Sequence, residues 1–288
     1  MQKKNFVHLH VHSHYSILDG LSKIDDLLNK VQSLGQKALA LTDHGVMYGA
    51  VEFFLKAKEK GIKPIIGSEV YIAPNSMDSK TKEDTNPYHL VLLAKNEEGY
   101  RNLMHLLTIA HLKGYYYRPR VDKKIIKKYS KGLIALSACL QGEIPSLIIS
   151  KKEKKLKEAI YFYKEIFGGD FYLEIQPHFN LEEQEKVNKE IIKLGKKYGI
   201  EIVATQDSHY LDKSDKEAHE ALLCIQTGTY LSDKNRMSMA IDDFHLSSQD
   251  EMWKIFKSFP WALNNTLKIA EKIKKEILDL KDYWLRKS

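Results

Sequence analysis

The stretch Asn5-Phe6-Val7-His8-Leu9-His10-Val11-His12 combines the apolar residues of a β-strand with histidines at alternate positions. Residues two apart on a strand point to the same face of a sheet, so the side chains of His10 and His12 are expected to share a face where this strand ends. Two imidazoles held in this way can bind one metal ion together. His8 shares their phase but would lie one layer deeper, where packing is the better expectation. His14 would lie past the strand, in the following loop.

Short apolar runs and amphipathic segments alternate along most of the chain. We predict strands near residues 5–12, 38–41, 63–72, 88–93, 132–136, 170–175 and 201–205. We predict helices near residues 24–34, 50–60, 97–111, 154–166 and 181–198. Near-continuous apolar strands that alternate with helices favour a parallel sheet covered by helices. Seven such units in about 210 residues predict an α/β fold with a closed or nearly closed barrel rather than an open sheet.

Residue types that bind metals recur at or near the ends of these predicted strands. The candidates are His10, His12, Asp19, His44, Glu69, His89, Cys139, Asp207 and His209. The C-terminal ends of parallel barrel strands share one mouth, where such folds build their active sites. Glu69 and His89 fall inside predicted strands rather than after them. Asp207 and His209 repeat the two-residue spacing of the first histidine pair.

The donor set mixes imidazole nitrogens, carboxylates and one thiol. Imidazole suits Zn and Fe, and carboxylates extend the range to Mn. Because a structural zinc site normally has four ligands, nine candidates predict two or three divalent transition-metal ions. Adjacent ions about 3.5–4 Å apart can stabilise both the attacking and the leaving oxygen of a phosphoryl displacement. The chain shows no nucleophilic triad and no Walker-type phosphate loop, so we predict no catalytic residue separate from the metal ligands.

Each candidate taken alone has a structural interpretation. Five other histidines are expected to be surface or satisfied core residues: His105, His111, His178, His219 and His245. Cys139 alone would be a small buried apolar residue, and Cys224, on an apolar helix face, keeps that interpretation. Asp43 has the alternative role of capping the turn beside His44. The recurrence of candidates after one strand upon another favours a metal centre.

Composition limits the class of protein. The chain has 288 residues and a formal charge of +7, from 45 Lys and Arg against 38 Asp and Glu. This balance favours an anionic partner such as nucleic acid, although many lysines fall on expected helix surfaces. Two cysteines imply no disulfide framework. No apolar run approaches the ~20 residues needed to cross a bilayer. We therefore expect a cytoplasmic protein without a membrane partner.

Four motifs follow one another along the chain: His8-Leu9-His10-Val11-His12-Ser13, Leu41-Thr42-Asp43-His44-Gly45, Gly67-Ser68-Glu69-Val70-Tyr71 and Thr205-Gln206-Asp207-Ser208-His209-Tyr210. Together with Tyr15-Ser16-Ile17-Leu18-Asp19-Gly20, the run His89-Leu90-Val91-Leu92-Leu93-Ala94 and Ser137-Ala138-Cys139, they resemble the PHP (polymerase and histidinol phosphatase) domain. More narrowly, they resemble the N-terminal region of bacterial DNA polymerase III alpha subunits. The resemblance covers about residues 5 to 275.

This resemblance implies a distorted (β/α)7 TIM-like barrel with a trinuclear site for Zn, Mn or Fe at its C-terminal mouth. All nine candidates match the family's ligand positions. The implied domains are a metal-dependent phosphoesterase barrel over residues 1–260 and, over residues 261–288, a linker or the start of the polymerase palm region. Family members that keep the full ligand set can show 3′-5′ exonuclease activity, whereas members that lost several ligands are structural. One departure is His14, where the family often has an acidic residue.

The expected function is a hydrolase in DNA replication. It would be the metal-dependent phosphodiesterase, or 3′-5′ exonuclease (proofreading) domain, of a DNA-directed DNA polymerase whose nucleotidyltransferase site lies outside this chain. Arg118 and Arg120, beside Tyr115-Tyr116-Tyr117, are expected to hold substrate phosphates. Their alternative role is a surface loop or a contact to the rest of the polymerase.

The expected partners are the 3′ end of DNA, the remainder of the polymerase alpha subunit and replisome proteins. Two other functions remain open. One is a histidinol-phosphatase-like phosphomonoesterase, and the other is a non-catalytic, metal-stabilised structural module of the polymerase.

Overall fold

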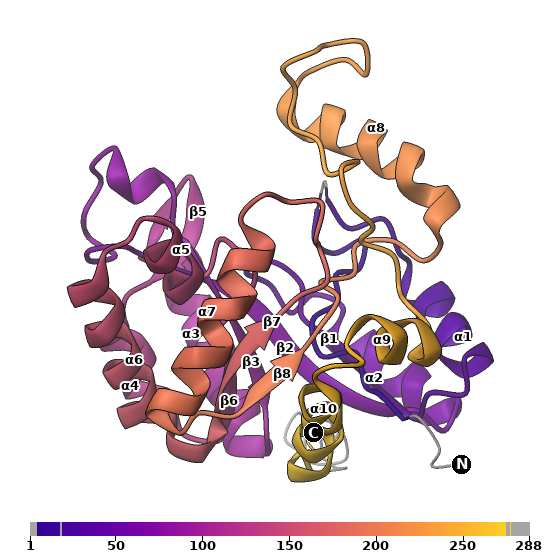
Figure 1. The fold of residues 1–288 in the computed structure, drawn as a ribbon, viewed down its shortest axis with the longest axis horizontal. Helices are drawn as coiled ribbons and strands as arrows, with labels where there is room; N and C mark the ends of the chain where they lie inside the picture. The colour runs from indigo at the N-terminus through magenta and orange to yellow at the C-terminus, as the bar shows by residue number, and fades with distance from the viewer. Residues whose placement is uncertain (1–4, 18, 275–276, 278–288) are drawn as a thin grey trace, which may run out of the picture.

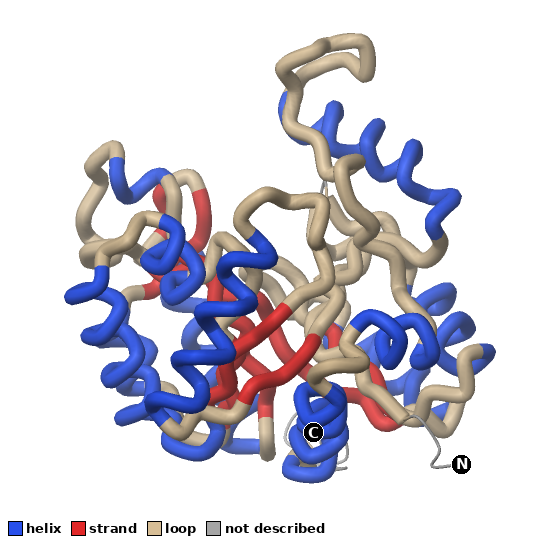
Figure 2. Tube along the Cα trace, viewed as in Figure 1, coloured by secondary structure: helices blue, strands red, loops and turns tan. Residues whose placement is uncertain are grey.

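A curled β-sheet forms the centre of the molecule, and helices cover it (Figures 1 and 2). The computed structural model describes residues 5–17, 19–274 and 277. The strands follow the order β4-β5-β2-β3-β6-β7-β8, and β1 pairs with β2 beside this path. Their bounds are β1 Ala38–Leu41, β2 Lys63–Ile72, β3 Tyr88–Ala94, β4 Tyr115–Tyr116, β5 Arg118–Val121, β6 Leu133–Leu136, β7 Phe171–Ile175 and β8 Ile202–Ala204.

The N-terminal segment connects the two ends of this curled sheet. His8 forms an isolated parallel bridge with Leu39 of β1, and Val11 forms one with Ser208, just after β8. The amide of His12 also donates to the carbonyl of Ser208. Backbone pairing thus continues from the end of β8 through this segment to β1, and it surrounds a barrel interior. The predicted α/β barrel is confirmed, but the regular strand predicted over residues 5–12 is wrong, since only isolated bridges form there.

Strand β3 departs from the expected parallel arrangement. It pairs antiparallel with β2 on one side and with β6 on the other. The pairs β1–β2, β6–β7 and β7–β8 are parallel. The connection over residues 73–87 holds only the 3-10 helix Glu83–Thr85, so no helix carries the chain back before β3 begins. The prediction of a fully parallel sheet is wrong here, and the start of β3 lies at the mouth where the parallel strands end.

The helices are α1 Ile24–Ser33, α2 Ala50–Glu59, α3 Glu97–Leu112, α4 Lys123–Lys128, α5 Glu143–Ile149, α6 Glu153–Phe167, α7 Gln184–Tyr198, α8 Lys216–Thr227, α9 Gln249–Ile255 and α10 Pro260–Lys272. The five helices predicted between strands correspond to α1, α2, α3, α6 and α7. Helices α4 and α5 and the hairpin β4–β5 were not predicted, because their runs are too short to show a periodic pattern. No helix in the described part of the chain combines the length and apolar character needed to span a membrane.

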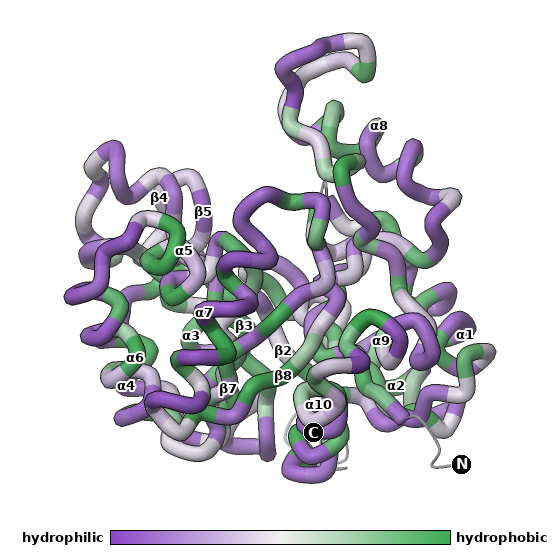
Figure 3. The backbone as a smooth tube through the Cα atoms, viewed as in Figure 1, coloured by the Kyte–Doolittle hydropathy of each residue, from purple (hydrophilic) through white to green (hydrophobic). Residues whose placement is uncertain are grey.

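The apolar core lies on both faces of the sheet. On β3, Val91 and Leu93 belong to the cluster inside the barrel, whereas Leu90 and Leu92 belong to the cluster that includes residues of α3, α6 and α7. This alternation follows from the pleat, because successive side chains on a strand point to opposite faces. Figure 3 shows that apolar residues are frequent along the strands, whereas hydrophilic residues are frequent in the helices and loops around them.

Helix α10 covers the end of the barrel opposite the mouth (Figure 1). Lys63, at the start of β2, donates to the carbonyl of Ala270, and Asn265 donates to the carbonyl of Ile202 at the start of β8. Ile269 belongs to the same buried cluster as the interior side chains of β3. The predicted domain boundary at residue 260 stays a prediction. The last part of the predicted linker or palm region over residues 261–288 lies outside the described residues.

We expect Ile269→Ala to lower the free energy of unfolding by about 2–5 kcal/mol, because it removes buried methyl groups and leaves a cavity. Ile269 is fully buried. The control is Lys268→Ala, which removes only a surface ion pair with Glu201 and should cost less than about 1 kcal/mol. Urea unfolding followed by circular dichroism measures both. Equal stability of the two variants would show that α10 is not integral to the barrel.

Candidate metal centre

Glu69 lies at the centre of the barrel mouth. Its Oε1 is 3.3 Å from Nε2 of His10 and 3.0 Å from Nδ1 of His89, and its Oε2 is 2.8 Å from Nδ1 of His44. The sulfur of Cys139 lies 3.9 Å from the same Oε1. One buried carboxylate thus contacts predicted ligands from four different segments of the chain.

Asp207 joins the two members of the first histidine pair. Its Oδ1 lies 3.2 Å from Nε2 of His10 and 3.2 Å from Nε2 of His12. These contacts confirm the expectation that the two imidazoles converge on one face. The backbone carbonyl of Asp207 accepts a hydrogen bond from Nδ1 of His209 at 2.9 Å, which fixes the orientation of that ring.

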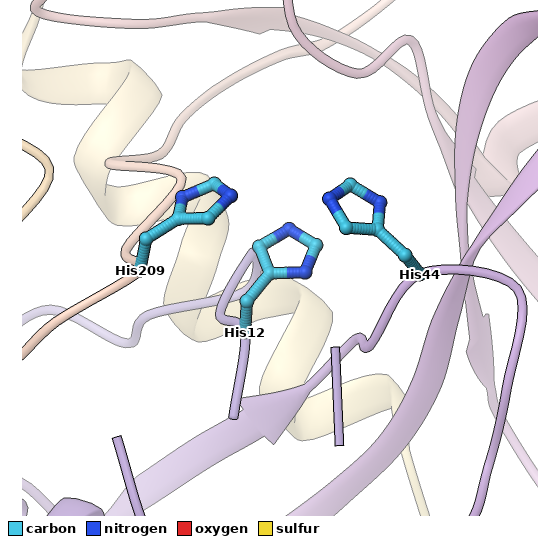
Figure 4. A group of neighbouring side chains, drawn as sticks. All are labelled: His12, His44 and His209. Atoms are coloured by element: carbon cyan, nitrogen blue, oxygen red, sulfur yellow. The ribbon is translucent and has the colours of Figure 1, made fainter. Parts of the chain in front are cut away.

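Three imidazoles from distant parts of the chain face one another (Figure 4). The ring centroid of His12 lies 4.1 Å from that of His44 and 4.4 Å from that of His209. Asp19 completes this side of the mouth, with Oδ2 at 3.2 Å from Nε2 of His44. The structure therefore brings all nine predicted ligands together at one mouth.

The reversed direction of β3 explains how His89 reaches this site. His89 is the second residue of β3, and its amide donates to the carbonyl of Gln141 in the segment that carries Cys139. Had β3 run parallel to its neighbours, its first residues would lie at the opposite end of the barrel. Glu69 lies inside the long strand β2, but His44 pairs directly with it, because the loop after β1 continues alongside β2.

The backbone is strained next to two predicted ligands. Asp207 has φ of 55° and Ala138, which precedes Cys139, has φ of 61°. The left-handed conformation costs a residue with a side chain roughly 1–2 kcal/mol. Such strain persists where the surrounding structure holds it, and it is concentrated at functional sites. Here it turns the carboxylate and the thiol toward the mouth.

Glu174, which is not among the nine candidate ligands, contacts one of them, His10. It is buried in β7, and its Oε1 accepts from Nδ1 of His10 at 2.8 Å and from Nε2 of Gln176 at 2.9 Å. With Nδ1 donating to Glu174, Nε2 of His10 is left to face Asp207. A carboxylate behind a metal-binding imidazole fixes its tautomer and raises its basicity. The available signal was a lone carboxylate in the apolar strand Phe171–Ile175.

Asp43 supports His12 through a serine. The hydroxyl of Ser16 donates to Oδ1 of Asp43 at 2.8 Å and lies 2.9 Å from Nδ1 of His12. Because the only hydroxyl proton points to Asp43, Ser16 accepts from Nδ1 of His12, which leaves Nε2 unprotonated toward the mouth. Asp43 also accepts from the amide of Ser13 at 2.7 Å, so it organises the loop after residue 12 as well.

Charge balance in the buried mouth shifts several pKa values. Burial alone would lower the pKa of His10, but the carboxylates of Asp207, Glu174 and Glu69 raise it well above its ordinary value. The pKa of His44 is raised in the same way, against burial, chiefly by Asp19. Burial alone would raise the pKa of Asp207, but His10 and other histidines lower it. The carboxylate of Asp207 is thus ionised at neutral pH, and its charge favours the protonated form of the neighbouring His10.

Two predicted ligands are held in their neutral forms by burial and by neighbouring protein groups. Burial lowers the pKa of His12 to about 3, and the neighbouring His44 and His209 add to the effect. Burial raises the pKa of the Cys139 thiol well above its ordinary value, and the charge of Glu69 raises it further. A bound cation would act in the opposite direction on the thiol, because thiolates are the metal-binding form.

The buried donor atoms at the mouth fit divalent transition-metal ions. Six of them form no hydrogen bond of acceptable geometry among the described residues, although all but Asp19 Oδ1 lie 2.8–3.2 Å from another of the six: His10 Nε2, His12 Nε2, His44 Nδ1, Asp19 Oδ1, Glu69 Oε2 and Asp207 Oδ1. Buried polar atoms normally have partners, so unpartnered atoms that converge on one place indicate a ligand. Three overlapping groups offer donor atoms within 4.8 Å of one another: His12 with His44 and His209, His10 with His12 and Glu69, and His44 with Glu69 and His89.

A cavity of about 500 Å³ opens onto these atoms. Tyr71 and Arg118 line one side of it, and Gln184, Gln226 and Phe244 line another. Part of its wall comes from α8 and the segment that follows, which project from the barrel (Figure 1). The volume lies within the usual range for small-molecule sites, so a substrate can reach the centre.

The two predicted substrate-binding arginines differ in position. Arg118 is exposed, lines the cavity and lies over the ring of Tyr71 at 5.9 Å. Arg120 is fully buried. Its guanidinium donates to the backbone carbonyls of Gly114, Asp84, Met77 and Ser79. The prediction that Arg120 binds substrate is therefore wrong, because this side chain folds the loop over residues 73–87.

Most of the other histidines have structural partners, as expected. Nε2 of His111 donates to the carbonyl of Gly45 at 2.9 Å, and Nε2 of His219 donates to the carbonyl of Asp19 at 2.8 Å. Both contacts support loops that carry predicted ligands. His178 is the exception, because it lines the cavity and neither ring nitrogen has a hydrogen-bond partner in the described part of the chain.

Comparison with known proteins gives one family and a consistent set of relatives. The pattern of the PHP domain matches residues 8–178. The chain is 46% identical over 272 residues to the DNA polymerase III subunit alpha of Borreliella burgdorferi, covering 94% of this chain and 24% of that protein. It is 44% identical over 291 residues to the same subunit of Helicobacter pylori, covering 98% of this chain and 24% of that protein. The chain thus spans about a quarter of the length of these relatives.

Solved structures show weaker likeness. One is an amidohydrolase from Chromobacterium violaceum, with a TM-score of 0.45 and 15% identity, covering 70% of this chain and 87% of that one. Another is a two-domain protein from Bacteroides vulgatus, described as containing a predicted PHP-like metal-dependent phosphoesterase. Its TM-score is 0.46 and its identity 16%, covering 91% of this chain and 63% of that one.

We expect Glu174→Gln to weaken metal binding about 10- to 100-fold, because an amide cannot support the His10 imidazole as a carboxylate does. The matched control is Glu165→Gln, which changes only an exposed glutamate paired with Lys127. Competition with a chromophoric chelator measures both affinities. Unchanged affinity in Glu174→Gln would mean that Glu174 is a structural residue only.

Metal binding should strengthen as pH rises above 6.5, the ordinary pKa of histidine. Protonated His10 and His44 stabilise the folded protein, because their pKa values are higher in the folded state than in the unfolded chain. This contribution is complete below pH 6.5 and is lost as the pH rises through the raised pKa values. A metal ion must displace the same protons, so its uptake releases protons to the buffer. Calorimetric titration in buffers of different ionisation enthalpy measures the release. Uptake without proton release would contradict the assignment of these histidines as ligands.

Proposed function

Because the chain belongs to the PHP domain family, we propose that it is a metal-dependent phosphodiesterase that removes nucleotides from the 3′ end of DNA. One observation carries this proposal. Six buried donor atoms of a mixed imidazole and carboxylate set, none with a hydrogen bond of acceptable geometry among the described residues, converge where a cavity of about 500 Å³ opens. Mixed nitrogen and oxygen donors are those that Zn, Mn and Fe share, and sites with two or more such ions cleave phosphate esters.

The proposed setting is a bacterial replicative DNA polymerase. Its support is the identity of 46% and 44% to two DNA polymerase III alpha subunits over nearly the whole chain. The remainder of such an alpha subunit, and through it the replisome in the cytoplasm, would be the partners. Residues 261–288 would begin the palm region or a linker to it.

Two to three divalent ions would be held by His10, His12, Asp19, His44, Glu69, His89, Cys139, Asp207 and His209. When bound, such ions supply Lewis acidity at the scissile phosphate. Glu174 holds the ring of His10, and Ser16 with Asp43 holds the ring of His12, so both present Nε2 to the mouth. Arg118 at the rim supplies a positive charge for a neighbouring phosphate of the strand.

We expect slow 3′-5′ digestion of a 3′-tailed, end-labelled oligonucleotide that needs added Mn or Zn. It should fall as salt rises, because phosphate binding releases counterions. The control is His12→Ala, which removes one predicted ligand and should lose nearly all activity. Elemental analysis of the same samples should find more than one transition-metal ion per wild-type chain.

The outcomes separate the three candidate functions. A fully metallated wild type that is no more active than His12→Ala would contradict the exonuclease and favour a structural module. Faster cleavage of histidinol phosphate than of the oligonucleotide would favour a phosphomonoesterase. The proposal is supported if the oligonucleotide is shortened one nucleotide at a time from its 3′ end, without an initial delay and without cleavage elsewhere.

A further inference from the structure

One wall of the cavity uses none of the predicted metal ligands. It consists of His178, Gln184, Gln226 and Phe244, which we call the His178 wall. His178 follows β7, Gln184 begins α7, Gln226 lies in α8, and Phe244 lies between α8 and α9. The wall adjoins the metal centre, because the Phe244 ring meets the ring of His209 edge-on at 5.8 Å between centroids.

His178 has unused hydrogen-bonding capacity. Its side chain is 1% exposed, and neither Nδ1 nor Nε2 has a hydrogen-bond partner among the described residues. The Oδ1 of Asp242 lies 3.9 Å from Nδ1, which is too long for a hydrogen bond. The ring instead stacks on Phe244 at 4.0 Å between centroids. A buried imidazole without partners is costly, so its position on the cavity wall indicates a ligand.

Two glutamines add acceptors to the same wall. The Nε2 of Gln184 donates to Oδ1 of Asn188 at 3.0 Å, which orients the amide and leaves its buried Oε1 without a partner. The Oε1 of Gln226 is also buried and without a partner among the described residues. The side-chain amide of Asn188 donates to the backbone carbonyl of Gln176, whose own side chain donates to Glu174 behind the metal centre. The orientation of Gln184 is therefore connected to the same network that holds His10.

The chemistry of this wall differs from that of the opposite side. Among the described residues that line the cavity, Arg118 is the one Lys or Arg, and it lies on the β5 side. The His178 wall offers amide oxygens, an imidazole that can donate or accept, and a stacked aromatic pair. Such a surface suits a flat, neutral ring with polar edges better than it suits a second phosphate.

We propose that the His178 wall binds the base of the terminal nucleotide, a role that rests on the proposed phosphodiesterase function. His178, Gln184 and Gln226 hydrogen-bond the edge of the base, while the phosphate lies at the metal centre and Arg118 holds the strand that continues from it. A base whose edge is bound here cannot be paired with a template at the same time. The site therefore takes an unpaired 3′-terminal nucleotide.

The test compares two probes that differ only in the base: dAMP and 2-deoxyribose 5-phosphate. The full chain reconstituted with Mn binds each probe in a calorimetric titration. We expect wild-type protein to bind dAMP at least about tenfold more tightly, as base stacking and one or two neutral hydrogen bonds would give. His178→Phe keeps the aromatic packing on Phe244 but removes both nitrogens, and Gln226→Leu changes a half-buried residue of α8. Each should reduce dAMP affinity about 3- to 10-fold and leave the sugar phosphate affinity unchanged.

The control variant is His105→Phe, which changes an exposed histidine stacked on Tyr129 and should bind both probes as wild type does. Equal affinity of wild-type protein for the two probes, or no binding of either, would overturn base recognition. A His178→Phe variant that weakens both probes alike would also overturn it. Oligonucleotide cleavage on the same samples separates the two proposals. A wild type that prefers dAMP but cleaves nothing contradicts the exonuclease alone, and an active wild type without the preference contradicts the His178 wall alone.

Discussion

The carboxylates of Glu69 and Asp207 lie buried together at the mouth of the barrel, and the site depends on how their charge is balanced. Taking a carboxylate out of water is costly unless an opposite charge or several hydrogen bonds compensate for it. Among the protein's own groups, His10 and His44 provide that compensation, as their raised pKa values indicate. Several donor atoms beside these histidines form no hydrogen bond of acceptable geometry among the described residues. A divalent cation would supply the positive charge that the carboxylates need and would contact these donor atoms.

The rest of the fold serves to bring these groups to one place. The parallel strands deliver loops to the mouth, and the reversed strand β3 delivers His89 from its beginning. The backbone is left-handed at Asp207 and at Ala138, next to Cys139, so the segments that carry these two candidate ligands are locally strained. Helix α10 packs against the far end of the barrel, and the cavity lies at the opposite end with the donor atoms. Supporting contacts from Glu174 and Asp43 then set which nitrogen each imidazole presents.

The two sides of the cavity above the mouth differ in chemistry, and this difference indicates what kind of substrate fits. Arg118 supplies positive charge on one side, while the His178 wall supplies neutral donors and acceptors on the other. A substrate with a central phosphate, a charged strand on one side and a neutral ring on the other matches these three surfaces. Plain phosphate monoesters would leave the His178 wall unused. A nucleotide at the end of a strand would contact all three surfaces, which favours it as the substrate.

The sequence by itself determined the alternation of strands and helices, the ligand candidates, and the grouping at one mouth of those candidates that follow parallel strands. Those features follow from local periodicity and from the rule that parallel strands end together. Only the tertiary structure decided the direction of β3, because short apolar runs pair equally well in either direction and the choice depends on the connection. It also decided the role of Arg120, since an arginine two residues from the exposed Arg118 shows the same local pattern whether it is buried or free. Glu174 gave the sequence signal of a lone carboxylate in an apolar strand, but its role, like that of His178, was recognisable only in space, because a hydrogen bond to His10 and a missing partner depend on neighbours distant in the chain.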